Sequence, residues 1–306
     1  MEYVLQTFGL FKKYKKHFAV NDADMTICRG DIYGFVGENG SGKTTIIRLI
    51  TGLIFPHAGR FELFGISHDS KDIQLARRKV GAVVESPSIY QNMSAYDNLK
   101  MQCMILGIPV DQKIEQTLDV VGLSYLLKEK KHVSNFSLGM RQRLGIAMAL
   151  LGDPEFLILD EPMNGLDPAG IVEIRELILK LNRERNITFL ISSHILSELS
   201  LVATKYGIIS KGHIIKEVTA AQLQAELTRT TDITVDQPET LIKLLADLLP
   251  EATVSYIPDG VRFVGEIDLN MILAAIIDAN IRITCVNCHE SSFEDYYLET
   301  IGGKRV

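Results

Sequence analysis

The chain of 306 residues contains no tryptophan and only four cysteines. The cysteine spacing does not suggest a disulfide framework, which favours a reducing compartment; the four are Cys28, Cys103, Cys285 and Cys288. The chain also lacks an apolar run of the roughly 18 to 20 residues needed to cross a bilayer. Residues 1–4 lack the basic-then-apolar pattern of a secretion signal. We therefore expect a protein that is made and kept in the cytoplasm.

A strongly basic surface is missing as well. The net charge is −6, and from Thr219 onward 6 Lys and Arg face 14 Asp and Glu, so this part carries −8 and the preceding residues +2. This balance disfavours nucleic acid as a partner.

A pattern of cysteine and histidine near the C-terminus could indicate a zinc site, but a β-strand explains it more simply. Cys285, Cys288 and His289 have a spacing that zinc sites use, but residues 281–288 alternate like a strand. Residues three apart on a strand point to opposite faces, and a structural zinc site needs a fourth ligand. We favour the strand over the metal site.

A glycine-rich loop is the most informative feature present. Residues 37–44 match the pattern G-x-x-x-x-G-K-T, after a strand-like stretch at 31–36 and before helical spacing at 45–50. A strand, glycine loop and helix in this order form a phosphate cradle, with backbone N–H groups and a helix N-terminus facing the anion. The expected nucleotide contacts are Gly37, Glu38, Asn39, Gly40, Ser41, Gly42, Lys43, Thr44 and Thr45. Lys43 reaches the β- and γ-phosphates, and Thr44 binds Mg²⁺.

Polar residues follow two fully apolar stretches, 156–159 and 187–192. Such strands are buried in parallel sheets, and ligands collect beyond their carboxyl ends. We therefore expect Asp160 to hold Mg²⁺, Glu161 to act as general base on the attacking water, and His194 to touch the γ-phosphate or that water. With Lys43, Glu161 and His194 are the predicted catalytic residues.

The ordered series of motifs resembles the nucleotide-binding subunit of an ABC transporter. It consists of F-S-L-G-M-R-Q-R at 136–143, the strand ending at Asp160 and Glu161, N-G-L-D at 164–167, and His194. The resemblance covers about residues 1–215. It implies that Ser137 and Gly139 contact the γ-phosphate held by a second subunit, and that Tyr14 stacks on adenine.

Two departures from the usual family motifs narrow the resemblance to one group of ABC transporters. The usual signature L-S-G-G-Q is F-S-L-G-M here, and Glu85 stands where the family usually has the Q-loop glutamine. Both features resemble the ATP-binding subunits of bacterial bacitracin- and lantibiotic-type exporters. Glu85 can accept hydrogen bonds and hold Mg²⁺-bound water, so it joins Thr44 and Asp160 as a metal candidate. Residues 90–108 resemble the helical subdomain that docks a permease, and ordinary core packing explains their periodicity equally well.

The expected fold is an α/β P-loop NTPase with a mostly parallel central sheet. We assign residues 1–218 to this ATPase domain, with a helical subdomain at about 86–152. Residues 219–306 form a smaller α+β domain, because strand- and helix-like stretches follow the order βαββαβ of a ferredoxin-like fold. In that domain, residues 258–260 form a hairpin turn.

The motifs thus predict a Mg²⁺-dependent ATPase. The resemblance implies that it powers a separate membrane permease and exports a peptide antibiotic of the bacitracin or lantibiotic type, for resistance or immunity. Two copies of the chain would form the ATP sites, on the inner face of the plasma membrane. A soluble regulatory ATPase of the same superfamily is the alternative; it predicts no cofractionation with membranes. A scaffold that binds ATP without hydrolysis is a third, and phosphate release would exclude it.

Overall fold

The computed structural model describes residues 2–15, 17–227, 229–248, 253–257, 259–265 and 268–302. The chain divides into two compact units, Met1–Ala220 and Ala221–Val306. Each unit has its own buried apolar core.

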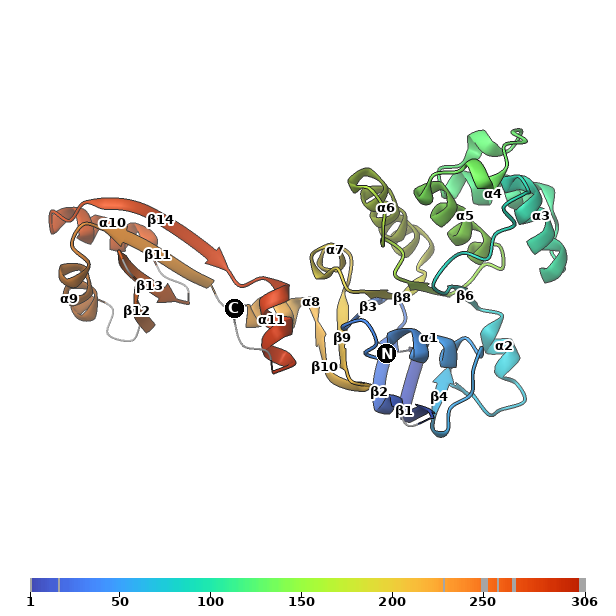
Figure 1. Ribbon diagram of the computed structural model, residues 1–306, viewed down its shortest axis with the longest axis horizontal. Coiled ribbons are helices and arrows are strands. Elements are labelled where there is room, and N and C mark those ends of the chain that lie inside the picture. The colour runs from blue at the N-terminus through green and yellow to red at the C-terminus, as the bar shows by residue number, and fades with distance from the viewer. Residues whose placement is uncertain are drawn as a thin grey trace. The chain divides into compact units, whose positions relative to one another are not determined.

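The first unit contains an antiparallel sheet near its N-terminus (Figure 1). Its strand order is β2-β1-β4-β5, with bounds Tyr3–Tyr14 for β1, His17–Cys28 for β2, Ala58–Leu63 for β4 and Ile66–Ser67 for β5. The two long strands form a hairpin in which Tyr14 is paired with His17.

The second sheet of this unit carries the predicted site residues at the ends of its strands. Its order is β10-β9-β3-β8-β7-β6, and the last five strands run parallel. Their bounds are Ile32–Val36 for β3, Val80–Val83 for β6, Phe156–Asp160 for β7, Thr188–Ser193 for β8, Lys205–Ser210 for β9 and His213–Thr219 for β10. Every residue of β3, β7 and β8 is buried, as expected for central parallel strands. The predicted mostly parallel sheet is therefore confirmed.

Helix α1 (Lys43–Ile50) joins the two sheets into one core. Its apolar residues Ile46, Ile47 and Leu49 share a buried cluster with Phe35 of β3 and Leu10 of β1. This packing fixes the helix N-terminus at the carboxyl end of β3. The shorter helices α2 (Ile73–Arg77) and α7 (Leu196–Ser200) and the long helix α6 (Pro168–Arg185) complete the unit.

A helical subdomain is inserted between β6 and β7, where the sequence predicted one (Figure 1). Its helices are α3 (Ala95–Leu106), α4 (Asp111–Val120) and α5 (Leu138–Leu150), with short 3₁₀ turns at Ser124–Leu126 and Val133–Asn135. Serine hydroxyls cap two of them: Ser94 accepts from Asp97 N in α3, and Ser137 accepts from Met140 N at 3.2 Å in α5.

The second unit has the predicted βαββαβ order. Its elements are β11 (Arg229–Val235), α9 (Pro238–Leu248), β12 (Thr253–Ile257), β13 (Gly260–Val264), α10 (Leu269–Asp278) and β14 (Ile283–Glu290). The antiparallel order β12-β13-β11-β14 is that of a ferredoxin-like sheet. Ile233, Phe263, Leu241 and Ile272 fill the core between the sheet and its two helices.

Two helices outside that pattern were not predicted, α8 (Ala220–Glu226) and α11 (Phe293–Thr300). The Tyr296 hydroxyl donates to Glu226 at 3.0 Å and so joins them. Of the hairpin turn predicted at 258–260, Pro258 lies outside the described residues.

All four cysteines are free, and Cys285 and Cys288 lie on strand β14. The described residues contain no group of three or more His, Cys, Asp or Glu that could hold a metal ion. In the same part of the chain, no helix has the length and apolar character needed to cross a membrane.

Candidate nucleotide-binding site

The glycine loop leads from β3 into α1, and its conformation requires glycine. Gly40 and Gly42 have φ angles of 82° and 116°. A Cβ atom on Gly42 would lie 2.3 Å from the Ala19 carbonyl oxygen, and one on Gly37 would lie 2.5 Å from that of Ile209. Within the described chain, no side chain caps the N-terminus of α1. Its first N–H groups are therefore available to an anion.

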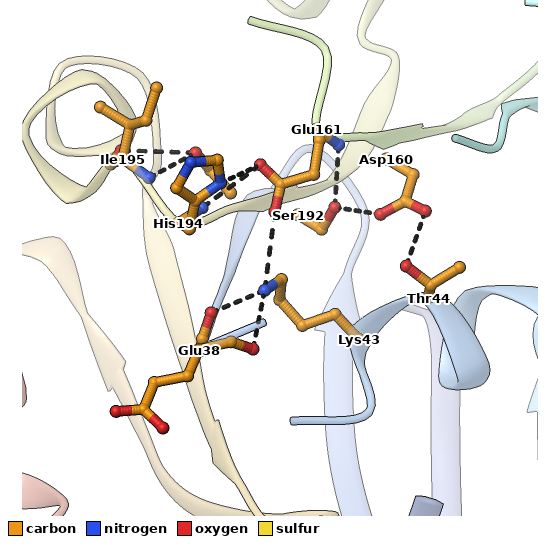
Figure 2. A network of polar contacts seen from close by, with 10 residues as sticks. Glu38, Lys43, Thr44, Asp160, Glu161, Ser192, His194 and Ile195 are labelled. Atoms are coloured by element: carbon orange, nitrogen blue, oxygen red, sulfur yellow. Dashed lines mark hydrogen bonds and ion pairs between the residues drawn. The ribbon is translucent and has the colours of Figure 1, made fainter. Parts of the chain in front are cut away.

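Lys43 is the buried cation of this loop, with only 5% of its side chain exposed. Its ammonium donates to the carbonyl oxygens of Gly37 at 2.6 Å and Glu38 at 3.3 Å, and lies 3.5 Å from Glu161 Oε1 (Figure 2). The Ser41 hydroxyl is buried and has no hydrogen-bond partner in the described structure. A buried donor of this kind beside an ammonium fits a phosphate oxygen.

Thr44 and Asp160 form an oxygen pair at the end of the parallel sheet. The Thr44 hydroxyl donates to Asp160 Oδ2 at 2.9 Å, and the Ser192 hydroxyl donates to Asp160 Oδ1 (Figure 2). Asp160 is 1% exposed. A carboxylate and a hydroxyl beside a phosphate cradle are the oxygen ligands that Mg²⁺ prefers, so these residues fit that ion.

Glu161 occupies a strained position between two polar partners. Its φ angle is 51°, a left-handed conformation that costs a non-glycine residue about 1 kcal/mol or more. Its N–H donates to the Ser192 hydroxyl at 3.0 Å, and its Oε2 lies 2.8 Å from His194 Nδ1. The hydrogen bond to Ser192 of β8 fixes the backbone, and the carboxylate lies between His194 and the Lys43 ammonium (Figure 2).

Glu85 lies apart from the other two metal candidates. Its Oε1 accepts a hydrogen bond from Arg48 Nη2 at 2.6 Å, and its φ angle is 61°. The structure thus brings Thr44 and Asp160 together and places the Glu85 carboxylate on Arg48.

A cavity of about 430 Å³ adjoins the glycine loop. Loop residues 38–41 line it together with His17, Phe18, Asn21 and Lys211. Tyr14 is not among these described lining residues; its ring lies in the β1–β2 hairpin, 42% exposed, with the Lys12 ammonium 5.6 Å from its centroid. His17 and Phe18 were not predicted to lie at the site, although they are in the same hairpin as Tyr14.

Comparison with known proteins decides the family. A family model described as ABC transporter matches residues 20–164. The bacitracin transport ATP-binding protein BcrA of Enterococcus faecalis is 38% identical, over 99% of this chain and 98% of its own length. The chain belongs to the ATP-binding proteins of ABC transporters.

Other relatives agree with this assignment. BcrA of Bacillus licheniformis is 39% identical over the full length of both chains, and the lantibiotic transport protein SrtF of Streptococcus pyogenes is 43% identical over 70% of this chain and 90% of its own. Among solved structures, cbiO1 of a Clostridium perfringens ABC transporter complex has a TM-score of 0.67 and 26% identity, covering 82% of this chain and 97% of its own. This ABC ATPase is therefore an ATP-hydrolysing transporter subunit, and a regulatory role outside transport is not favoured.

The signature residues of the ABC ATPase lie on the helical subdomain. Ser137 caps α5 and is exposed, and a Cβ on Gly139 would meet only Leu166, at 3.8 Å. No hydrogen bond among the described residues joins either one to loop 37–42.

Ser192 is the polar residue of the ABC ATPase that sequence reasoning overlooked. It bridges Asp160 and the backbone of Glu161. Its place at the end of an apolar strand, two residues before His194, was the available signal.

Proposed function

We propose that this ABC ATPase powers the export of a peptide antibiotic of the bacitracin or lantibiotic type, for resistance or immunity. The observation that carries the proposal is end-to-end similarity to BcrA, which includes the ferredoxin-like unit. The lantibiotic transport protein covers only 70% of the chain, which favours the bacitracin type.

The residues of the site have separate tasks in ATP hydrolysis. Residues 37–45 bind the triphosphate, and Lys43 contributes most to this binding. Thr44 and Asp160 hold Mg²⁺. When bound, that ion neutralises developing charge on the phosphates. Glu161 accepts a proton from the attacking water, and His194 orients the Glu161 carboxylate through their hydrogen bond. Tyr14 stacks on adenine, beside the cavity lined by His17 and Phe18.

We propose that each ATP site is completed by a second copy of the chain. Ser137 is exposed and caps α5, and no hydrogen bond in the described part of the chain joins it to its own glycine loop. The Ser137 hydroxyl accepts from one N–H group of α5, that of Met140, and the other N–H groups of the helix start can donate to an anion. The absence of a side chain on Gly139 lets a phosphate approach this backbone. ATP then joins the glycine loop of one copy to Ser137 of the other, and hydrolysis separates them.

A groove beside α1 is our candidate docking surface for the permease. Its volume is about 550 Å³, and apolar residues from the segment after α1, from β6 and from the helical subdomain line it, including Leu53, Val83, Leu106 and Met148. Through this contact the ATPase sits on the inner face of the plasma membrane.

The proposal is tested by purifying the chain from its own host's membranes and identifying the membrane protein that accompanies it. The pair is then reconstituted in lipid vesicles, with ATPase activity measured against bacitracin concentration. We expect a polytopic permease and a bacitracin-dependent increase in turnover; the Glu161→Gln pair serves as the control for contaminating ATPase. Recovery of the chain only in the soluble fraction contradicts the transporter role, and turnover indifferent to bacitracin and to a lantibiotic contradicts the substrate class.

A further inference from the structure

The partly exposed face of α1 binds two carboxylates, one on each of two successive turns. Thr44 donates to Asp160 at 2.9 Å, and Arg48 donates to Glu85 at 2.6 Å. Residues four apart lie on the same face of a helix, about 6 Å apart along its axis. The residue that binds Glu85 is therefore one turn further along α1 than Thr44, whose hydroxyl lies at the proposed magnesium position.

The backbone at Glu85 forms a tight turn that exposes this side chain. Ser86 N donates to the Val84 carbonyl oxygen at 2.8 Å, which closes a three-residue turn around Glu85 with its φ angle of 61°. Turns of this kind with positive φ are rare and strained. The turn leaves the Glu85 side chain 59% exposed, so its partner is chosen by side-chain contacts rather than by burial.

The surroundings make Arg48 the specific partner. Both residues line the 550 Å³ groove, where Glu85 is the one acid among the described lining residues, together with the arginines Arg48, Arg77 and Arg78. The contact that the structure gives Glu85 is with Arg48. The Arg77 guanidinium packs against Gly52, where an added Cβ would come within 2.5 Å of its Cζ. For Glu85 to reach Thr44, the bond to Arg48 must break.

We infer that Arg48 is the positioning residue for Glu85: its guanidinium holds the carboxylate in the groove and sets how readily Glu85 reaches the magnesium position. The inference rests on the proposed function, because it requires magnesium and ATP at Thr44. It also links the groove to the site, since whatever displaces Arg48 from Glu85 releases a carboxylate toward the ion.

The test is a double-mutant cycle on nucleotide affinity in the full chain. The dissociation constant of a fluorescent ATP analogue is measured in excess EDTA and in excess Mg²⁺. The ratio of the value in EDTA to the value in Mg²⁺ reports how much magnesium strengthens nucleotide binding. Removing a partly exposed ion pair through Arg48→Gln frees Glu85, so we expect the ratio to rise about two- to fivefold. Combined with Glu85→Gln, the same change leaves the ratio at the value of Glu85→Gln alone.

Two further variants separate positioning from general charge or folding effects. Arg48→Lys keeps the cation and retains the ratio of the unmodified chain, whereas Arg78→Gln removes a cation from the same groove and shows no coupling to Glu85→Gln. Urea unfolding midpoints verify the fold, and Arg48→Met replaces Arg48→Gln if the latter is unstable.

The inference is overturned if Arg48→Gln changes the ratio equally with and without Glu85→Gln, or if Arg78→Gln couples to Glu85 as strongly. In that case the unmodified chain still binds ATP more tightly with Mg²⁺, and the proposed function stands. An unmodified chain that binds no nucleotide in either buffer overturns both.

Discussion

His194 Nδ1 lies 2.8 Å from Glu161 Oε2, and the Lys43 ammonium lies 3.5 Å from the other oxygen of the same carboxylate. Each oxygen of the carboxylate therefore has a partner that orients it. Such preorganisation favours the transition state, because no energy is spent orienting the group during reaction.

His194→Ala removes the partner that orients Glu161. We expect kcat for ATP hydrolysis to fall about a hundredfold with little change in ATP affinity, since a misplaced catalytic group affects the chemical step. His57→Ala, at an exposed loop histidine, is the matched control and retains activity. Equal activity in the two variants would remove His194 from the mechanism.

Ser192→Ala removes the bridge between Asp160 and the backbone of Glu161. The loss of buried hydrogen bonds to a charged group lowers the free energy of unfolding by about 1–3 kcal/mol. We also expect at least about tenfold lower kcat, because both carboxylates lose their alignment. Ser193→Ala is the control, since among the described residues that hydroxyl accepts from Ile195 N and donates to the Ile195 carbonyl oxygen, within the same turn. Denaturant titration and ATPase assays that fail to separate the two serines contradict the bridging role.

Lys43→Ala removes the ammonium from the phosphate cradle. A charge-assisted hydrogen bond contributes about 1.5–3 kcal/mol, so ATP affinity falls at least about tenfold. Isothermal titration measures the change, with Lys71→Ala at an exposed position as the control. An unaltered ATP dissociation constant would mean that the triphosphate binds elsewhere.

Glu155, which precedes β7 at the end opposite Asp160, makes a pH-dependent contribution to stability. Hydrogen bonds from Lys79 and then Arg29 hold the pKa of Glu155 below its usual value of 4.5. A lowered folded-state pKa stabilises the protein above about pH 4.5, and this stabilisation is lost as the pH falls through the folded-state value. Glu155→Gln therefore lowers the free energy of unfolding by up to about 1 kcal/mol near neutral pH. The difference from the unmodified chain shrinks on acidification; a gap that stays constant in acid would contradict the ion-pair origin.

The sequence predicted those parts of the fold that depend on local pattern. A few consecutive residues are enough to recognise the apolar runs before Asp160 and His194. The same is true of the glycines of residues 37–42. The Glu85–Arg48 pair could not be found this way, because it joins positions 37 residues apart whose distance depends on how α1 packs on the sheet. Ser192 was overlooked for a related reason: a serine at the end of an apolar strand acquires its role only when β7 and β8 pair.

The C-terminal unit shows the same limit. Alternation and turn residues predicted the βαββαβ order, whereas α11 depends on contacts with α8 some 70 residues away in the chain. Ser292 and Asp295 form a capping box at its start, and that local signal was available.

The most direct test of the account is single-turnover ATP hydrolysis by the Glu161→Gln variant, with ATP binding and oligomeric state measured in parallel. Glutamine keeps the size of the side chain and cannot accept the proton of the attacking water. We expect unchanged ATP affinity, hydrolysis slower by about 10²- to 10⁴-fold, and an ATP-bound dimer that accumulates in size-exclusion chromatography. Hydrolysis at nearly the normal rate, or a chain that stays monomeric with ATP bound, would contradict it.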